Sequence, residues 1–282
     1  MGRLRTRMEQ DLVIRGLGRQ ASRSYLRAVE GLTRHYGRAP DTLSLDEVKA
    51  YLASLRAEAQ RPAAYVRSVI TGLRFFYEVT LGYRREDFSL PSPRLPKSQP
   101  HVLSRQEVER LLTATTHRRD RVMFMTAYSA GLRVSEVVRL QVSHIDSERM
   151  LLRVERGKGQ KDRYALLTER LLAELRAYWR AFEPPVWLFY GPSPEHPLSV
   201  RTVQRHYKAA KRRAGITKPG SVHGLRHAFA THLIEAGVDL STVQRLLGHS
   251  HVETTTRYLH LAPRTLAQRG SLCDLLHFGP PR

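Results

Sequence analysis

A proline-rich segment about one third of the way along the chain limits most strongly how this sequence can fold. Residues 89–102 contain few apolar side chains and four prolines: Pro91, Pro93, Pro96 and Pro100. Because proline removes a backbone donor and disfavours helix, the segment is predicted to be an extended linker. Ser104 and Glu107 follow as a capping-box pair, which predicts the start of a new helix. The chain should therefore form two domains, over residues 1–88 and 103–282, the second with a C-terminal tail from about 261.

The part before the linker has the apolar spacing of helices and no strand pattern. Apolar residues recur at intervals of three and four over residues 22–36 and 63–81, and a glycine ends each run. Between these runs, Ser44 and Glu47 form another capping-box pair. The pattern predicts four short helices that pack as a small bundle.

The part after the linker is predicted to be mostly helical, with one pair of strands. Two short β-prone runs, residues 150–154 and 163–167, flank the turn sequence R-G-K-G-Q-K-D and predict a hairpin. Helical spacing predicts the other elements, over residues 121–131, 169–182, 199–214, 225–236, 242–247 and 252–259. The expected fold class is therefore mostly α with a small β-hairpin, an α+β arrangement.

The charge of the chain predicts a polyanionic partner. Its 47 Lys and Arg residues exceed its 26 Asp and Glu residues, which gives a net charge of +21. Residues 1–90 carry 16 basic and 10 acidic side chains, and the remainder carries 31 and 16, so both parts are basic. Nucleic acid is the usual partner of such a chain, and it would be gripped between the two domains. On composition alone, a membrane surface, a ribosome or a merely solvated basic surface stay open.

Two features predict the cellular location. The single cysteine, Cys273, excludes a disulfide framework and a thiolate metal cluster. No apolar run approaches the ~20 residues of a membrane span, and no apolar signal core follows the basic N-terminus. We therefore expect a cytoplasmic, nucleoid-associated protein with no membrane partner.

Five short motifs contain residues suited to chemistry at a phosphate. They supply six candidate catalytic residues: Arg133 in G-L-R-V-S-E, Lys158 in G-K-G, His223 and Arg226 in H-G-L-R-H, His249 in L-G-H-S, and Tyr258 in T-R-Y-L-H. Glu136 stands near enough to Arg133 to orient it. His223 and Arg226, three residues apart at a helix start, share one helix face. Four of them also have an ordinary interpretation: surface charge for Arg133, a solvated turn for Lys158, a helix cap for His249 and packing for Tyr258.

Together the motifs favour phosphoryl transfer without a metal or cofactor. Two arginines, a lysine and two histidines form a donor set for a phosphate that gains negative charge in the transition state. The sequence has no acidic cluster of the kind that holds Mg²⁺ and no G-x-x-x-x-G-K-[ST] loop. A zinc site at His223 and His227 would lack both the glutamate of H-E-x-x-H and a third ligand. We therefore expect a side-chain nucleophile.

In their order and spacing, these motifs resemble those of the tyrosine recombinases, or phage integrase family, most closely the Xer and integron-integrase branch. The resemblance covers nearly the whole chain. It implies a SAM-like helical core-binding domain that clamps DNA, followed by a catalytic tyrosine recombinase domain. Residues 187–220 are too few to hold the extra helical insertion of the integron integrases. The tail after Tyr258 also differs from the usual Xer ending, so its leucines either dock on a neighbouring subunit or fold back on their own domain.

The resemblance implies a site-specific recombinase that breaks and rejoins DNA. Tyr258 would form a 3′-phosphotyrosyl link, while Arg133 and Arg226 clamp the phosphate oxygens. His223 would assist proton transfer at the tyrosine, His249 would donate to a phosphate oxygen, and Lys158 would protonate the departing 5′-hydroxyl. The implied partners are double-stranded DNA, three further copies of the chain in a homotetrameric complex at a four-way junction, and accessory DNA-binding proteins. The free protein is expected to be a monomer. Basic residues of one predicted helix are expected to contact phosphates: Lys208, Lys211, Arg212 and Arg213.

Two other functions stay open on the residues. A type IB topoisomerase uses similar chemistry but reseals the same strand. A DNA-binding protein without catalysis would explain the charge, although all six chemical positions are filled. An RNA-binding role would also explain the charge, but it would not account for the placement of the histidines and the tyrosine.

Overall fold

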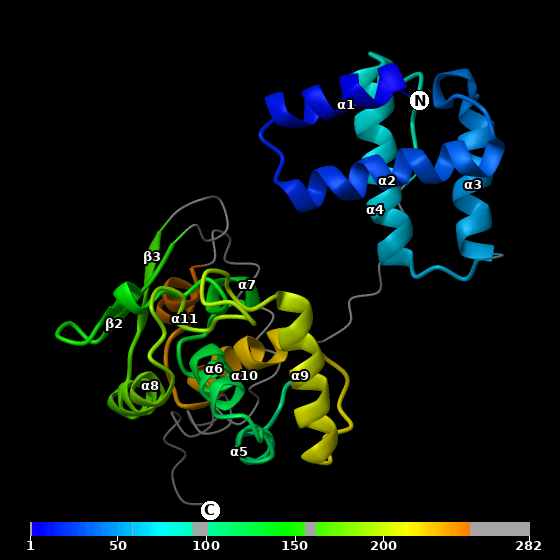
Figure 1. Cartoon of the computed structure of the whole chain (residues 1–282). Helices are drawn as coiled ribbons and strands as arrows, with labels where there is room; N and C mark the ends of the chain where they lie inside the picture. Colours follow the sequence, from blue (N-terminus) through cyan, green and yellow to red (C-terminus); the bar gives the residue numbers. More distant parts are fainter. Residues whose placement is uncertain (1, 58, 92, 94–100, 156–161, 249–282) are drawn as a thin grey trace, which may run out of the picture. The chain divides into compact units, whose positions relative to one another are not determined.

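The computed structural model describes residues 2–57, 59–91, 93, 101–155 and 162–248. The chain divides into two compact units, Met1–Ser98 and Gln99–Arg282 (Figure 1). No helix in the described ranges is long and apolar enough to cross a membrane.

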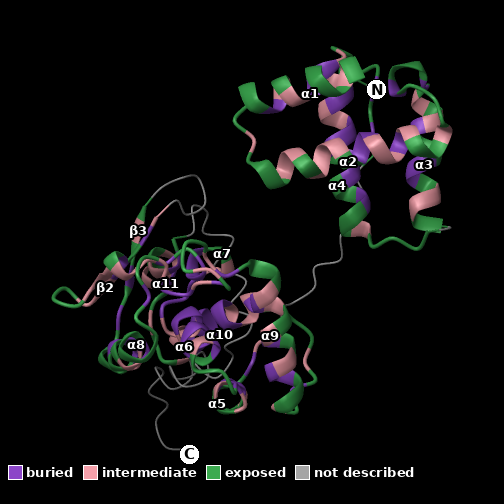
Figure 2. Ribbon diagram, in the orientation of Figure 1, coloured by how far each residue is buried: buried purple, intermediate pink, exposed green. Residues whose placement is uncertain are grey.

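The N-terminal unit is a bundle of helices, as predicted. Its elements are α1 (Gly2–Ile14), α2 (Arg19–Tyr36), the short turn η1 (Pro40–Thr42), α3 (Leu45–Ala57), α4 (Ala63–Arg74) and the π-helical continuation η2 (Phe75–Thr80). Its core contains Leu32, Val48, Leu73 and Phe76, all at most 1% exposed. The helices bury one side and expose the other, as expected of an amphipathic bundle (Figure 2). The predicted number of four helices agrees with α1 to α4, although the sequence pattern assigned no run to α1, which buries only Met8 and Leu12.

The predicted capping boxes both form. At the start of α3, the backbone N–H of Glu47 donates to the Ser44 hydroxyl at 3.2 Å, and the backbone N–H of Ser44 donates to the Glu47 carboxylate at 2.8 Å. Ser104 and Glu107 make the same reciprocal pair at 2.7 and 3.2 Å, at the start of the first helix of the next unit. Each pair satisfies two backbone donors that the first helical turn leaves without partners.

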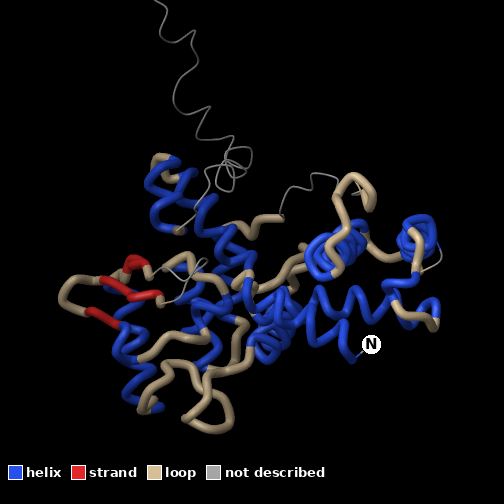
Figure 3. Tube along the Cα trace, turned by 90° about the horizontal axis from the view of Figure 1, so that it is seen from above, coloured by secondary structure: helices blue, strands red, loops and turns tan. Residues whose placement is uncertain are grey.

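The C-terminal unit consists of helices with a small antiparallel sheet at one side (Figure 3). Its helices are α5 (Arg105–Thr113), α6 (Arg118–Ser129), α7 (Val134–Val137), α8 (Glu169–Phe182), α9 (Val200–Arg213), α10 (His223–Glu235) and α11 (Leu240–Leu247), with a short turn η3 (Val142–His144). The strands are β1 (Ile145–Asp146), β2 (Leu151–Val154) and β3 (Arg163–Leu166), in the order β1-β2-β3. The predicted hairpin is β2 and β3. Strand β1 was not predicted, because two residues are too short a run to show alternation.

The register of the hairpin decides which β3 side chains point inward. Val154 pairs with Arg163, and Leu152 pairs with Ala165. Ala165, Val154 and Leu152 are at most 2% exposed, whereas Tyr164 is 60% exposed. Because side chains alternate along a strand, Arg163 lies on the same inward face as Ala165.

Among the described helices of this unit, α10 has the largest share of buried residues. It packs against α5, α6 and α11, and its alanines Ala228 and Ala230 are fully buried. Because a helix that is buried on most sides has no amphipathic stripe to mark its ends, the predicted start, Leu225, lies two residues after the observed first residue, His223. Gly131, at the end of α6, has a φ of +60°, and a β-carbon there would lie 2.5 Å from the Phe229 ring of α10. Only glycine therefore permits this close approach.

Candidate active site

Arg133 lies where α6 gives way to α7. The chain turns at Gly131 and starts α7 directly after Arg133. The Arg133 guanidinium donates to Glu136 Oε1 at 2.7 Å, and its backbone N–H donates to Glu136 Oε2 at 2.8 Å. The expectation that Glu136 orients Arg133 is therefore confirmed.

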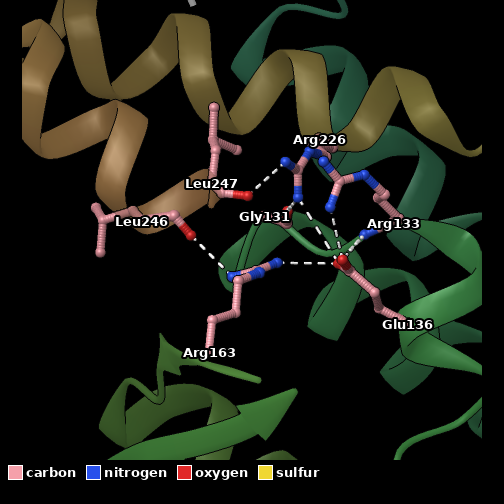
Figure 4. A network of polar contacts seen from close by, with 7 residues as sticks. All are labelled: Gly131, Arg133, Glu136, Arg163, Arg226, Leu246 and Leu247. Atoms are coloured by element: carbon pink, nitrogen blue, oxygen red, sulfur yellow. Dashed lines mark hydrogen bonds and ion pairs between the residues drawn. The ribbon is translucent and has the colours of Figure 1, made fainter. Parts of the chain in front are cut away.

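Arg226 comes to the same place from α10, and its contact with Gly131 spans ninety-five residues of sequence. Its side chain is 1% exposed. One guanidinium nitrogen donates to the carbonyl of Gly131 and the other to the carbonyl of Leu247, each at 2.6 Å. The first nitrogen also lies 3.7 Å from Glu136 Oε2. Figure 4 shows Arg133 and Arg226 converging on this carboxylate. The structure thus brings together the two arginines that the sequence motifs separate.

A third arginine, Arg163, joins this group from β3 and was not among the predicted site residues. Its guanidinium lies 2.9 Å from Glu136 Oε2 and donates to the carbonyl of Leu246 at 2.9 Å (Figure 4). A signal for it existed in the sequence. In the strand sequence R-Y-A-L, Arg163 falls on the same face as the apolar Ala165, which predicts that it points inward. A charged side chain that points inward needs a partner there.

Glu136 is the anion at the centre of the three guanidinium groups. Its side chain is only 4% exposed. Burial raises its pKa, but the charge of Arg163 and the hydrogen bonds and charge of Arg133 outweigh that effect and hold the pKa below its usual value. Glu136 is therefore ionised at neutral pH. Three arginine charges against one carboxylate leave an excess of positive charge, as suits a site for a phosphate.

His223 lies on the first turn of α10, three residues before Arg226. Its ring packs edge-on against that of His227, with centroids 4.5 Å apart. Among the residues that the structure describes, no group of three or more His, Cys, Asp or Glu side chains is arranged to hold a metal ion.

Three of the six predicted residues, Lys158, His249 and Tyr258, lie outside the described residues. Their roles stay predictions. The described elements end next to two of them: β2 and β3 flank the segment with Lys158, and α11 ends at Leu247, with Gly248 as its left-handed cap directly before His249.

One prediction about phosphate contacts is wrong. Lys211 of α9 is buried, and its ammonium donates to the backbone carbonyl of Lys218. Arg213, of the same predicted set, uses its Nε to donate to the carbonyl of Ala114 at 2.9 Å. Helical spacing alone did not reveal that Lys211 falls on the buried side of α9. Lys208 and Arg212 are exposed and border a cavity of about 530 Å³.

Comparisons with known proteins cover most of the chain and agree on its family. Residues 101–264 match the model of the phage integrase family, and residues 4–87 match that of the phage integrase N-terminal SAM-like domain. The protein y4qK of Sinorhizobium fredii, whose name places it provisionally among integrases and recombinases, is 40% identical over 97% of this chain and 89% of its own length. Tyrosine recombinase XerA of Thermococcus onnurineus is 38% identical, over 80% of both chains.

Solved structures have the same fold. A lambda integrase tetramer bound to a Holliday junction matches 91% of this chain and 76% of its own with a TM-score of 0.75, at 20% identity. A crystal structure of XerA recombinase matches 95% of this chain and 96% of its own with a TM-score of 0.56, at 25% identity. With the family match over more than half of the chain and the identity to y4qK and XerA, this chain belongs to the phage integrase family, the family of the tyrosine recombinases.

Proposed function

We propose that this protein is a site-specific DNA recombinase that cleaves and rejoins DNA through a covalent 3′-phosphotyrosyl link. The observation that carries the proposal is the buried cluster in which Arg133, Arg163 and Arg226 surround the single carboxylate of Glu136. Such a cluster has an excess of positive charge fixed in a place of low dielectric, where it stabilises a phosphate that gains negative charge.

In this proposal Tyr258 is the nucleophile. A tyrosine has a pKa near ~10, so keeping it ionised at pH 7 would cost about 4 kcal/mol. It must therefore lose its proton as it attacks the phosphorus, and we assign His223 to assist that transfer. Arg133 and Arg226 would hold the non-bridging oxygens, and His249 would donate to one of them. Planar guanidinium groups suit this task because they offer paired donors.

The attack breaks the bond from phosphorus to the 5′-oxygen and forms the bond to the tyrosine oxygen. The departing 5′-hydroxyl takes a proton, which we assign to Lys158. Because the phosphodiester energy is retained in the phosphotyrosyl link, a 5′-hydroxyl of another strand can attack it and release the tyrosine. The sequence of steps needs no metal, nucleotide or redox cofactor.

We propose double-stranded DNA as the substrate, with residues 1–88 as the DNA clamp and residues 103–282 as the catalytic part. Two rounds of strand exchange pass through a four-way junction and require four active sites. The lambda integrase of similar fold is a tetramer bound to a Holliday junction, which supports a tetramer on DNA for this protein. The free protein would be a monomer, and its substrate would place it at the nucleoid.

Covalent capture in cells tests the proposal without knowledge of the DNA site. Wild type and Tyr258→Phe are expressed in the host, denatured, purified stringently and tested for attached DNA, which is then sequenced. We expect an adduct in wild type alone, ending at one repeated junction, because phenylalanine has no nucleophilic oxygen. Both proteins should bind the captured sequence equally well.

Three outcomes would contradict parts of this proposal. A covalent DNA adduct in Tyr258→Phe would contradict the assignment of Tyr258 as the nucleophile. No adduct in either protein would indicate a DNA-binding protein without catalysis. Relaxation of supercoiled DNA without exchange between two sites would instead indicate a topoisomerase of type IB.

A further inference from the structure

We infer that Arg163 is a positioning residue for DNA cleavage: it ties the end of α11 that precedes His249 to Glu136 in the arginine cluster. The inference rests on the proposed function and concerns a residue outside the six that the motifs predict. Arg163 would not touch the reacting atoms but would act through the groups that it holds.

The position of Arg163 in β3 directs its side chain inward. The strand pairs it with buried Val154, and its side chain is 13% exposed. Arg163 follows the segment 156–161, which contains Lys158, by two residues. Strand β3, which follows the segment with Lys158, thus begins with Arg163, and the side chain of Arg163 enters the arginine cluster.

The two ends of the Arg163 guanidinium contact different elements. Nη2 lies 2.9 Å from Glu136 Oε2 in α7, and Nη1 donates to the carbonyl of Leu246 in α11 at 2.9 Å. The aliphatic part passes directly over Gly248, where a β-carbon would lie 2.5 Å from Arg163 Cδ. The side chain therefore has little freedom, and it bridges α7 and α11 as a rigid spacer (Figure 4).

Two arginines thus hold consecutive carbonyls at the end of α11. Arg163 bonds that of Leu246 and Arg226 bonds that of Leu247. The last carbonyls of a helix lack partners within it and carry partial negative charge, so cations are favoured there. Both guanidinium groups also face Glu136. The last turn of α11 is consequently fixed against the cluster just before the chain reaches His249.

This role requires an arginine rather than any cation. A guanidinium is planar and presents donors in two directions, whereas an ammonium is a compact charge. Arg163→Lys would keep the positive charge beside Glu136 but could not reach both Glu136 and Leu246. Arg163→Gln would lose the charge as well. The two variants therefore separate the geometric part of the role from the electrostatic part.

The first test measures cleavage apart from DNA binding. The duplex captured with wild type is cleaved under single-turnover conditions at saturating DNA, and affinity is measured separately by mobility shift. A misplacement of about 1 Å can slow a reaction about 100-fold, so we expect Arg163→Lys and Arg163→Gln to cleave about 10- to 100-fold more slowly with unchanged affinity. The matched control is Arg153→Gln on β2, because Arg153 is half exposed and forms ion pairs with the partly exposed carboxylates of Glu155 and Asp162. It should cleave as wild type does.

The second test uses pH. Glu136 faces Arg133, Arg163 and Arg226, and the charge of Arg163 is the largest influence that lowers its pKa. Loss of that charge lets burial raise the pKa, so Glu136 becomes protonated at a higher pH. The acid limb of the cleavage rate should therefore move to higher pH in Arg163→Gln, and it should stay in place in Arg163→Lys and Arg153→Gln. A residue that only supports the fold would not separate these variants.

The third test needs no activity. Hydrogen exchange of the free protein should show faster exchange at the end of α11 in both Arg163 variants and not in Arg153→Gln. Wild-type exchange at α11 together with a wild-type cleavage rate in Arg163→Lys would overturn the inference. If Arg163→Gln fails to fold, Arg163→Lys alone decides. Absence of any wild-type adduct would refute the proposed function, while the exchange result would still decide whether Arg163 holds α11.

Discussion

At the scale of single residues, one carboxylate organises the site. Without Glu136, three guanidinium groups close together would repel one another, and the burial of Arg226 would lack a compensating charge. With it, each arginine has an ionic partner and a defined orientation. The arrangement stays cationic overall, which suits a phosphate ligand.

The loss of Arg226 should affect both stability and cleavage. Arg226→Ala leaves the carbonyls of Gly131 and Leu247 without this donor, and leaving a buried polar group unsatisfied costs about 1–3 kcal/mol. Cleavage should slow at least ~100-fold, as for loss of a donor to a transition-state oxyanion. Thermal denaturation and single-turnover adduct formation measure the two effects. Arg149→Ala, at a side chain that is 80% exposed, is the control, and an unchanged cleavage rate in Arg226→Ala would refute the clamp.

Glu136 should make stability depend on pH. Because its pKa is lowered in the folded state, its contribution is fully present above its ordinary pKa of about 4.3 and is lost as pH falls through the folded value. Glu136→Gln should therefore be less stable than wild type at pH 7, by on the order of 3 kcal/mol, since one partner of a buried ion pair is removed. The difference should shrink as pH falls below about 4.3. Denaturant titrations over this range measure it, and a constant difference would contradict the assignment.

At the scale of elements, the end of α11 is where several parts of the unit meet. Strand β3 supplies Arg163 and helix α10 supplies Arg226, while Gly248 ends the helix with a φ of +63°. Because Arg163 passes close to Gly248, the position of the Arg163 side chain and the conformation of the end of α11 depend on each other. A substitution at either residue should therefore shift both.

Two glycines, Gly248 after α11 and Gly215 after α9, allow the cost of backbone strain to be measured apart from the cost of a side-chain clash. Gly248 and Gly215 have nearly the same φ, +63° and +65°, but a β-carbon would meet Arg163 at Gly248 and nothing within 4 Å at Gly215. Gly215→Ala should thus cost only the strain of a left-handed residue, about 1–2 kcal/mol. Gly248→Ala should cost more and should also slow cleavage. Equal losses of unfolding free energy and wild-type cleavage in both variants would show that Arg163 is not held there.

At the scale of the whole molecule, charge is spread over both parts of the chain. The net charge of +21 is shared between residues 1–90 and the remainder, so DNA would release counterions along an extended contact.

Binding of DNA should therefore weaken steeply with salt. If six to ten phosphates are contacted, affinity should fall by about 10³- to 10⁵-fold between about 50 and 200 mM salt. Tyr258→Phe is the protein to use, because cleavage then does not interfere. Residues 101–282 alone should show a smaller slope in a plot of log affinity against log salt. A shallow slope for the full chain would argue against an extended phosphate contact.

Local patterns along the chain were enough to predict much of this protein. Helix starts at Ser44 and Ser104 follow from capping boxes, and the β2–β3 hairpin follows from two short strand-prone runs around a glycine-rich turn. The membership of the phage integrase family follows from motif order. These signals involve residues close together in the sequence, so they need no knowledge of packing.

Only the tertiary structure decided which distant residues meet. Arg133, Arg163 and Arg226 come from three separate elements, and their convergence on Glu136 depends on how α7, β3 and α10 pack. The burial of Lys211 and the contact of Arg163 with Leu246 are likewise absent from any local pattern. The physical reason is that burial pairs each polar group with whatever partner the fold brings near, and that partner is set by packing across the whole unit rather than by its neighbours in sequence.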